Sequence, residues 1–192
     1  MENIEFVEIE HKFLLEDDFD QQPFLQMVER LEPSGRSQVR VSDRYYLCES
    51  NPSHIYRHRL DQEIQHLTLK GLGKDSETRI EVNLDLGLHR GDQGDRVAAF
   101  LKPLGIQWSG VIEKDVWAYY FKNCEVVYYE AHFKEKSVRC IEIEATNCQT
   151  LDEAKATIAN FEKKLGLNPT NRCGESLFHL LLLPEVNAQV NP

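Results

Sequence analysis

Polar and apolar residues alternate through residues 7–13, near the start of the chain. Because successive side chains of a β-strand point to opposite faces, Glu8, Glu10 and Lys12 would share one face of a strand here. The residues between them, which are mainly apolar, would share the other face. A polar face of this kind is common on the solvent side of an antiparallel sheet, so this segment alone predicts only a half-buried strand.

The same kind of pattern returns along the chain and predicts a largely antiparallel β protein. Each further strand is marked by alternation, or by β-branched and aromatic residues, between turn residues. The later segments with this character are residues 38–47, 54–60, 64–70, 78–84, 111–121, 125–131 and 137–146. With the first segment they make eight expected strands.

Apolar residues at helical spacing predict three helices between or after the strands. In the second helix, Phe100 is expected on the buried side. The last segment, residues 176–183, is nearly all apolar, and we expect a buried helix or turn that ends at Pro184. The three expected helices cover residues 23–32, 91–104 and 151–165.

Charged residues of both signs occupy one face of most of these strands. On a flat face open to solvent, such a mixture would have no chemical meaning. If the strands close into a barrel, the same side chains come close together in a lumen. Buried charges are tolerated there when they balance one another and hold ligands. The charged residues expected to face the lumen are Glu8, Glu10, Glu81, Glu142 and Glu144, with Lys12, Arg57, Arg59, Lys70, Arg79 and Lys114.

The acidic and basic residues of this face have complementary ligand preferences. Carboxylates bind hard divalent cations such as Mg²⁺ or Mn²⁺ through oxygen, whereas clustered Lys and Arg side chains bind phosphate oxygens. A lumen that combines them suits a metal-bound polyphosphate. The chain has no G-x-x-x-x-G-K-S/T motif, so this phosphate site is not a P-loop.

Short motifs follow one another along the strands in a definite order. They are Glu8-x-Glu10-x-Lys12, Asp43-x-Tyr45-Tyr46, Arg57-x-Arg59, Lys70, Arg79-x-Glu81, Lys114, Glu142-x-Glu144 and the closing Ser176-Leu177-Phe178-His179-Leu180-Leu181. In this order they resemble the CYTH superfamily, also called triphosphate tunnel metalloenzymes, over about residues 4 to 183. The resemblance implies an α+β fold: an eight-stranded antiparallel β-barrel, the triphosphate tunnel, with helices packed outside. It also implies a single CYTH-like domain over residues 1–192.

The resemblance further implies an enzyme that acts on small triphosphates with Mg²⁺ or Mn²⁺. Members of that family hydrolyse inorganic tripolyphosphate or thiamine triphosphate, or convert ATP to cyclic AMP as class IV adenylyl cyclases. We expect metal-dependent hydrolysis of an inorganic, thiamine or nucleoside triphosphate. The alternatives are ATP cyclisation, which needs the same phosphate cradle, and a catalytically weak module that binds polyphosphate or nucleotide.

By the same resemblance, each charged residue of the lumen has an expected role. The expected metal ligands are the carboxylates Glu8, Glu10, Glu81, Glu142 and Glu144. The residues expected to hold the triphosphate are Arg57, Arg59, Lys70 and Arg79. The expected catalytic residues, which would line the same tunnel, are Lys12 and Lys114.

Three positions depart from the usual pattern of that family. The strand with Lys114 usually reads K-x-R, and here Val116 stands in place of the arginine. The strand before the second E-x-E motif usually holds an aspartate. None is present in residues 125–130, and Glu130 would substitute for it only in a shifted register. In the closing motif, Leu177 replaces a tyrosine. The lost arginine and aspartate are expected to change rate and substrate more than fold.

Other reactive or aromatic residues have plainer explanations. His11 lies on the strand face opposite the glutamates, so we expect it to pack in the wall of the barrel rather than bind a ligand. Trp108 and Trp117 are expected in the core, because large aromatic side chains contribute mainly through burial.

Composition narrows the partners and the compartment. The chain has 22 Lys and Arg against 32 Asp and Glu, a net charge of -10, which argues against a nucleic-acid partner. It lacks both an apolar run of about 18 residues and a signal peptide, so we expect no membrane association and a cytoplasmic location. Five cysteines without C-x-x-C spacing are expected to be reduced thiols. The expected partner is a small-molecule triphosphate, and the protein is expected to be a monomer or homodimer.

Overall fold

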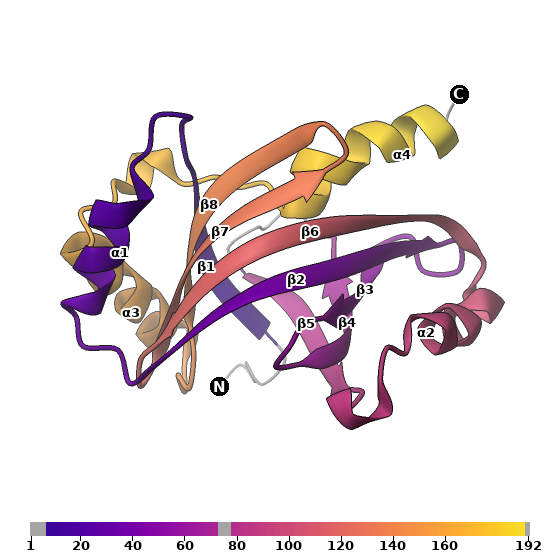
Figure 1. Ribbon diagram of the computed structural model, residues 1–192, viewed down its shortest axis with the longest axis horizontal. Coiled ribbons are helices and arrows are strands. Elements are labelled where there is room, and N and C mark those ends of the chain that lie inside the picture. The colour runs from indigo at the N-terminus through magenta and orange to yellow at the C-terminus, as the bar shows by residue number, and fades with distance from the viewer. Residues whose placement is uncertain (1–6, 73–77, 191–192) are drawn as a thin grey trace.

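Eight strands form one closed antiparallel barrel (Figure 1). The structure is a computed structural model that describes residues 7–72 and 78–190. Around the barrel the strands follow the order β1-β5-β4-β3-β2-β6-β7-β8, which confirms the predicted α+β fold with an eight-stranded barrel. The strands are β1 (Val7–Leu14), β2 (Gly35–Cys48), β3 (His54–Leu60), β4 (Gln65–Gly71), β5 (Thr78–Asp85), β6 (Ile106–Tyr120), β7 (Cys124–Phe133) and β8 (Lys136–Ala145).

Strand β1 closes the barrel because its two halves pair with different neighbours. Its first half lies against β5, where Val7 is opposite Ile80. Its second half lies against β8, where Glu10 is opposite Glu144. Glu8 and Glu10 therefore lie at the seam where β5, β1 and β8 meet.

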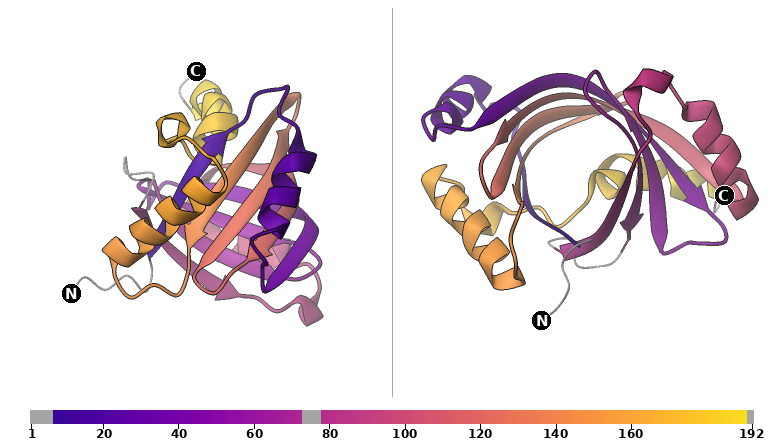
Figure 2. Two further views of the ribbon diagram at one scale, coloured as in Figure 1. Left: turned by 90° about the vertical axis from the view of Figure 1, so that its left-hand side faces the viewer. Right: turned by 90° about the horizontal axis from the view of Figure 1, so that it is seen from below.

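Helices cover the outside of the barrel on two sides. Figure 2 shows α1 (Gln21–Glu29) and α3 (Leu151–Lys164) together on one side and α2 (Gly94–Leu101) on the other. The side chains of Asp20 and Thr150 cap α1 and α3 by accepting a hydrogen bond from a backbone N–H of the first turn. Within the described part of the chain, no helix has the length and apolar character needed to cross a membrane.

The apolar face of the strands packs under these helices. Ile143 and Val126 on the outer face of the barrel are buried in one cluster with Ile158 of α3. On the other side, Leu67 of β4 packs with Leu101 of α2. Because these outward residues of β4, β7 and β8 are covered, the charged residues that alternate with them point inward.

A third apolar cluster closes one end of the barrel. The C-terminal segment forms a π-helix at Phe178–Leu182 that leads into α4 (Leu183–Val190). Leu177 and this π-helix are buried in one cluster with Tyr45 and Ile55. The C-terminal segment therefore packs against side chains that line the interior of the barrel.

The second predicted helix is wrong in its limits and in one buried residue. Residues 91–104 do not form one helix, because α2 covers only Gly94–Leu101 and is followed by a 3₁₀ turn. Phe100, expected to be buried, is 67% exposed. The short helix buries only Val97 and Leu101, and Phe100 falls beside this stripe.

The predicted end of the last helix at Pro184 is also wrong. The chain stays helical through this residue, from the π-helix into α4. Pro184 lies where the π-helix passes into α4, so the hydrogen-bond pattern already changes at the residue that has no N–H to donate. The prediction that this segment is buried holds for Phe178, Leu181 and Leu182.

Candidate functional site

The interior of the barrel is a cavity of about 320 Å³. Its lining comes from all eight strands and from the segment before the π-helix. The structure brings all the sequence-predicted site residues together in this one cavity. They are Glu8, Glu10, Lys12, Arg57, Arg59, Lys70, Arg79, Glu81, Lys114, Glu142 and Glu144.

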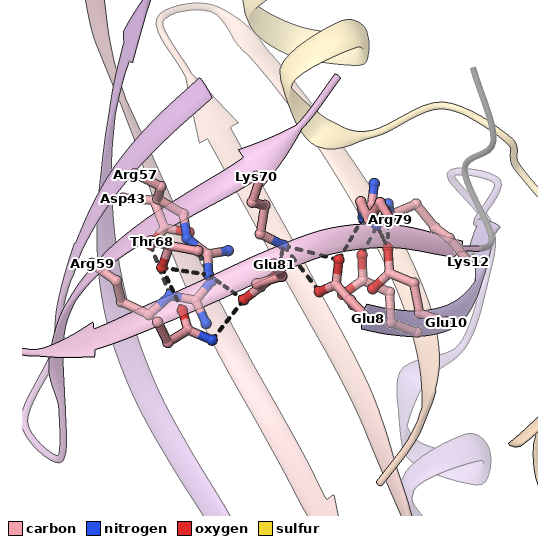
Figure 3. A network of polar contacts seen from close by, with 12 residues as sticks. Glu8, Glu10, Lys12, Asp43, Arg57, Arg59, Thr68, Lys70, Arg79 and Glu81 are labelled. Atoms are coloured by element: carbon pink, nitrogen blue, oxygen red, sulfur yellow. Dashed lines mark hydrogen bonds and ion pairs between the residues drawn. The ribbon is translucent and has the colours of Figure 1, made fainter. Parts of the chain in front are cut away.

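Glu8 lies at the centre of a network of basic side chains on β4 and β5 (Figure 3). The Lys70 ammonium donates to one Glu8 oxygen at 3.0 Å, and Arg79 Nε donates to the other at 2.5 Å. Lys70 also lies 2.5 Å from Glu81, and Arg79 pairs with Glu10. Burial would raise the pKa of Glu8, but the charges of Lys70 and Arg79 hold it well below its usual range.

Lys12 and Glu142 form a second ion pair on paired strands. Lys12 Nζ lies 3.0 Å from Glu142 Oε1 and 3.5 Å from Glu10. The Tyr129 hydroxyl donates to the same Glu142 oxygen at 2.8 Å. Burial would raise the pKa of Glu142, but Lys12, Lys114 and the tyrosine bond lower it to about 2. Glu142 is therefore a fixed negative charge in this cavity.

Asp43 forms a third charged cluster that was missed as a site residue. It is fully buried, its two carboxylate oxygens lie 2.8 and 2.9 Å from Arg59, and Lys114 Nζ lies 2.6 Å from it. Burial together with the charge of Arg59 lowers the pKa of Lys114 to about 8, although Asp43 acts in the opposite direction. Asp43 and Tyr45 are two residues apart on β2 and therefore lie on the same face of the strand. Since Tyr45 lines the cavity, this spacing could have identified Asp43 as a site residue.

Arg57 has a donor that the protein does not use. Its Nη2 lies 3.3 Å from the Thr68 hydroxyl and 3.3 Å from Glu81, as Figure 3 shows. Its buried Nε has no hydrogen-bond partner within the described residues. A buried donor without a partner is costly, so this N–H is ready for an oxygen of a ligand.

Carboxylate side chains lie next to one another on three neighbouring strands, β1, β8 and β7. Glu144 lies opposite Glu10 on β1 and opposite Glu125 on β7. Burial, followed by the charges of Glu8 and Glu125, raises the pKa of Glu144 to about 8. Glu125 was not predicted as a site residue, although it lines the same cavity, and its own pKa is raised by burial.

The two departures on β6 and β7 are visible in the cavity. Val116 lines it on β6, two residues from Lys114, so no basic group occupies that part of the wall. On β7 the register places Tyr129 inside and Glu130 outside, where Glu130 lies 3.7 Å from His132. Glu130 therefore does not substitute for the aspartate.

His11 and the tryptophans lie where the sequence analysis expects them. His11 is buried outside the cavity, with Nδ1 2.7 Å from Glu162 of α3. Arg172 holds the same carboxylate through two hydrogen bonds. Trp108 is buried in the cluster at the closed end, and Trp117 packs against the cluster under α1 and α3.

A closed antiparallel barrel with basic and carboxylate side chains in its interior is the architecture of a triphosphate tunnel. The CYTH domain matches residues 7–173, and the chain belongs to the CYTH family. That family consists typically of triphosphatases and generally uses divalent metals. No curated protein matches the chain in sequence.

Solved structures from several organisms have the same fold. The PH1012 protein from Pyrococcus horikoshii is 21% identical with a TM-score of 0.71, over 91% of this chain and 99% of that chain. A candidate adenylate cyclase from Bacillus halodurans is 15% identical with a TM-score of 0.62, over 92% and 99%. HpAC1 from Hippeastrum, described as a candidate adenylyl cyclase with a dominant triphosphatase activity, is 13% identical with a TM-score of 0.56, over 93% and 97%.

The carboxylates of the cavity fit a divalent cation in their chemistry. They supply the oxygen ligands that Mg²⁺ and Mn²⁺ take, and the raised pKa of Glu144 marks a corner where a cation would relieve repulsion. In residues 7–72 and 78–190, however, no group of three or more His, Cys, Asp or Glu side chains is arranged to hold a metal ion. Glu8, Glu10 and Glu142 are turned toward lysine and arginine instead. Metal binding therefore requires these ion pairs to open.

Proposed function

We infer that this protein is a divalent-metal-dependent triphosphatase that removes the terminal phosphoryl group from a small triphosphate. The observation that carries the inference is the cluster of basic side chains inside the closed barrel, with one buried arginine N–H left unused. Membership of the CYTH family supports it, and so does the triphosphatase activity described for HpAC1. The charges of the cavity are paired with one another and leave room for a polyanion with its counter-cation.

Binding would proceed by an exchange of partners within the cavity. Phosphate oxygens would replace the carboxylates on the basic side chains, and a divalent cation would take the carboxylates that are released. A buried ion pair is costly to break when one charge is left without a partner. The exchange avoids this cost, because every buried charge keeps a partner of opposite sign. The residues that would bind phosphate are Arg57, Arg59, Lys70 and Arg79. The residues that would hold the cation are Glu8, Glu10, Glu81, Glu142 and Glu144.

The chemical step would depend on charge stabilisation by fixed donors. When bound, the divalent cation supplies Lewis-acid polarisation of the phosphoryl oxygens. Lys12 and Lys114 would donate hydrogen bonds to the oxygens on which negative charge develops. Their ion-pair partners, Glu142 and Asp43, hold both ammonium groups in place before substrate arrives. A water molecule would attack the terminal phosphorus as its bond to the bridging oxygen breaks, which releases orthophosphate and leaves a diphosphate.

A binding module with weak catalysis is the second candidate function. It is favoured by Val116, which leaves the wall beside Lys114 without the second basic group. Binding would survive this loss better than turnover, because such a group acts mainly where charge shifts in the transition state.

The test is product analysis with three substrates. Purified protein is incubated with tripolyphosphate, thiamine triphosphate or ATP, each with Mg²⁺ or Mn²⁺, and the products are separated by anion-exchange chromatography. Release of orthophosphate supports hydrolysis. Formation of cyclic AMP and pyrophosphate from ATP would instead show that the protein is a cyclase. Tight binding without any product would favour the binding module. Arg44→Ala, an exposed residue outside the cavity, serves as the control for Arg57→Ala.

A further inference from the structure

Tyr129 on β7 is a buried tyrosine of the cavity that has no role in the proposed function. Its side chain is 2% exposed and lines the cavity, where its hydroxyl donates to Glu142 Oε1 at 2.8 Å. The ring is packed in the apolar cluster around the π-helix, which also contains Tyr45 and Phe178. Because this packing fixes the ring, the hydroxyl has a defined position before any ligand arrives.

Tyr129 lies between the two lysines that are expected to act in the chemical step. The barrel order places β6, β7, β8 and β1 side by side, and these strands carry, in turn, Lys114, Tyr129, Glu142 and Lys12. Lys114 Nζ lies over the Tyr129 ring, 5.5 Å from its centroid, and Lys12 Nζ lies 3.0 Å from Glu142 Oε1. These side chains therefore form one continuous line of contacts across neighbouring strands.

Both contacts of the Glu142 carboxylate use the same oxygen. Oε1 accepts from the Tyr129 hydroxyl and pairs with Lys12, and within the described residues no bond to Oε2 is present. The hydroxyl is neutral and has no charge that phosphate would compensate, so it can remain on Oε1 when Lys12 exchanges its partner. Glu142 would then keep one fixed partner and have its second oxygen available.

On the basis of the proposed function, we propose that Tyr129 is a positioning residue, whose hydroxyl holds Glu142 so that its second oxygen is presented to the divalent cation. Hydrogen bonds of this kind orient the ligands of metal sites, and their loss typically lowers metal affinity or activity by about 10- to 100-fold. A neutral hydroxyl does so without adding another negative charge to the carboxylates of β1, β7 and β8 that line the cavity.

The test measures binding of a metal complex rather than turnover. Isothermal titration with Mn²⁺ present uses imidotriphosphate, an analogue of tripolyphosphate whose P–N–P bridges resist hydrolysis. Tyr129→Phe keeps the ring and its contact with Lys114 and removes only the hydroxyl. It is expected to weaken binding of the Mn²⁺ complex by about tenfold or more. Tyr128→Phe is the matched control, because Tyr128 is equally buried on the outer face of the same strand and should bind the complex as the parent protein does.

A double-mutant cycle distinguishes positioning through Glu142 from a general effect on packing. Glu142→Gln keeps the shape of the side chain but removes the charged carboxylate that would hold the cation. In this background, Tyr129→Phe should change the affinity for the Mn²⁺ complex by no more than about twofold, because the hydroxyl no longer has a metal ligand to orient. Thermal unfolding checks that each variant is folded.

Equal loss of affinity in both backgrounds would overturn the proposal, since Tyr129 would then act on the cavity without Glu142. If the parent protein and Tyr129→Phe bind the Mn²⁺ complex equally tightly, the hydroxyl has no positioning role and the proposed function stands. If the parent protein does not bind the complex at all, the proposed function itself is overturned, and the role of Tyr129 with it.

Discussion

Asp43 holds Arg59 through two parallel hydrogen bonds, from Nε at 2.8 Å and from Nη2 at 2.9 Å. Burial would raise the pKa of this carboxyl, but the charges of Arg59 and Lys114 hold it well below its usual range. Two basic side chains of the candidate site are thus fixed by one buried carboxylate. Asp43 connects the stability of the barrel to the orientation of two basic groups that we propose contact the triphosphate.

Asp43→Asn is expected to destabilise the protein by about 3 to 5 kcal/mol at pH 7, the usual effect of breaking a buried ion pair. The folded pKa of Asp43 is lowered, so its stabilising effect is present above the ordinary aspartate pKa of about 3.9 and is lost as the pH falls through the folded value. Denaturant unfolding of both proteins from pH 7 to pH 3 measures this. The exposed Asp18→Asn is the control, and a gap that stays constant with pH would contradict the prediction.

Lys114 is expected to make triphosphate affinity depend on pH above neutrality. Its pKa of about 8, lowered by burial and by Arg59, means that its charge is lost as the pH rises through this value. Affinity for tripolyphosphate should then fall, and Lys114→Arg, which keeps its charge, should remove the fall. The free energy of unfolding changes in the opposite direction. The pKa of the lysine in the unfolded chain is about 10.4, so between about pH 8 and pH 10.4 the unfolded state binds more protons and stability rises with pH. Titrations from pH 7 to pH 9.5 test this, and equal slopes for both proteins would contradict it.

Arg57→Ala and Arg59→Ala are each expected to weaken triphosphate binding by about 1.5 to 3 kcal/mol, the range for hydrogen bonds to charged groups. This corresponds to a loss of about tenfold or more in affinity. Arg57 carries the unused Nε, so its removal should affect binding more than it affects stability. Arg44→Ala should bind tripolyphosphate as the parent protein does. Unchanged affinity in both cavity variants would show that these arginines do not bind the ligand.

Removal of divalent metal is expected to abolish turnover, since the cavity carboxylates would otherwise repel a triphosphate. Glu10→Gln and Glu144→Gln should each raise the metal concentration needed for half-maximal rate, because each removes a carboxylate that would hold the cation. Glu10→Gln also breaks buried ion pairs with Lys12 and Arg79 and should lower stability, whereas Glu144→Gln relieves repulsion from Glu8 and Glu125. The rate is measured against Mg²⁺ and Mn²⁺ concentration after dialysis against chelator. Glu135→Gln on the exposed β7–β8 turn is the control. Full activity without metal would exclude the proposed metal role.

Strand alternation predicted which charged side chains share a face, because a period of two decides the face of every side chain once one face is covered. The closed barrel itself was implied by the resemblance to the CYTH superfamily, and Asp43 and Glu125 were not predicted as site residues. Asp43 stands in one of the motifs that carry the family resemblance, but it was given no role in the site. Its two partners, Arg59 and Lys114, are brought to it only by pairing with β3 and β6. Phe100 was misplaced because the buried stripe of the short helix α2 is narrow and consists of Val97 and Leu101 alone. Pairing between distant strands and the limits of short helices are tertiary properties that local patterns do not contain.

The last prediction concerns Val116, which lies in the cavity two residues from Lys114 where the family usually has an arginine. A basic group there would stabilise charge that develops in the chemical step, and such a group acts on the rate more than on ground-state binding. Val116→Arg is therefore expected to raise the single-turnover rate with tripolyphosphate more than it changes the affinity.

The comparison uses equilibrium binding and single-turnover hydrolysis of tripolyphosphate by both proteins. This substrate has no organic group, so the comparison measures only the effect of the added charge on phosphate binding and on the chemical step. Val82→Arg on the outer face of β5 adds the same charge outside the cavity and should leave the rate unchanged. If Val116→Arg tightens binding and leaves the rate as it was, the position is a binding contact alone. Slow turnover would then have to be explained by β7 alone, where Tyr129 faces the cavity and no aspartate is present.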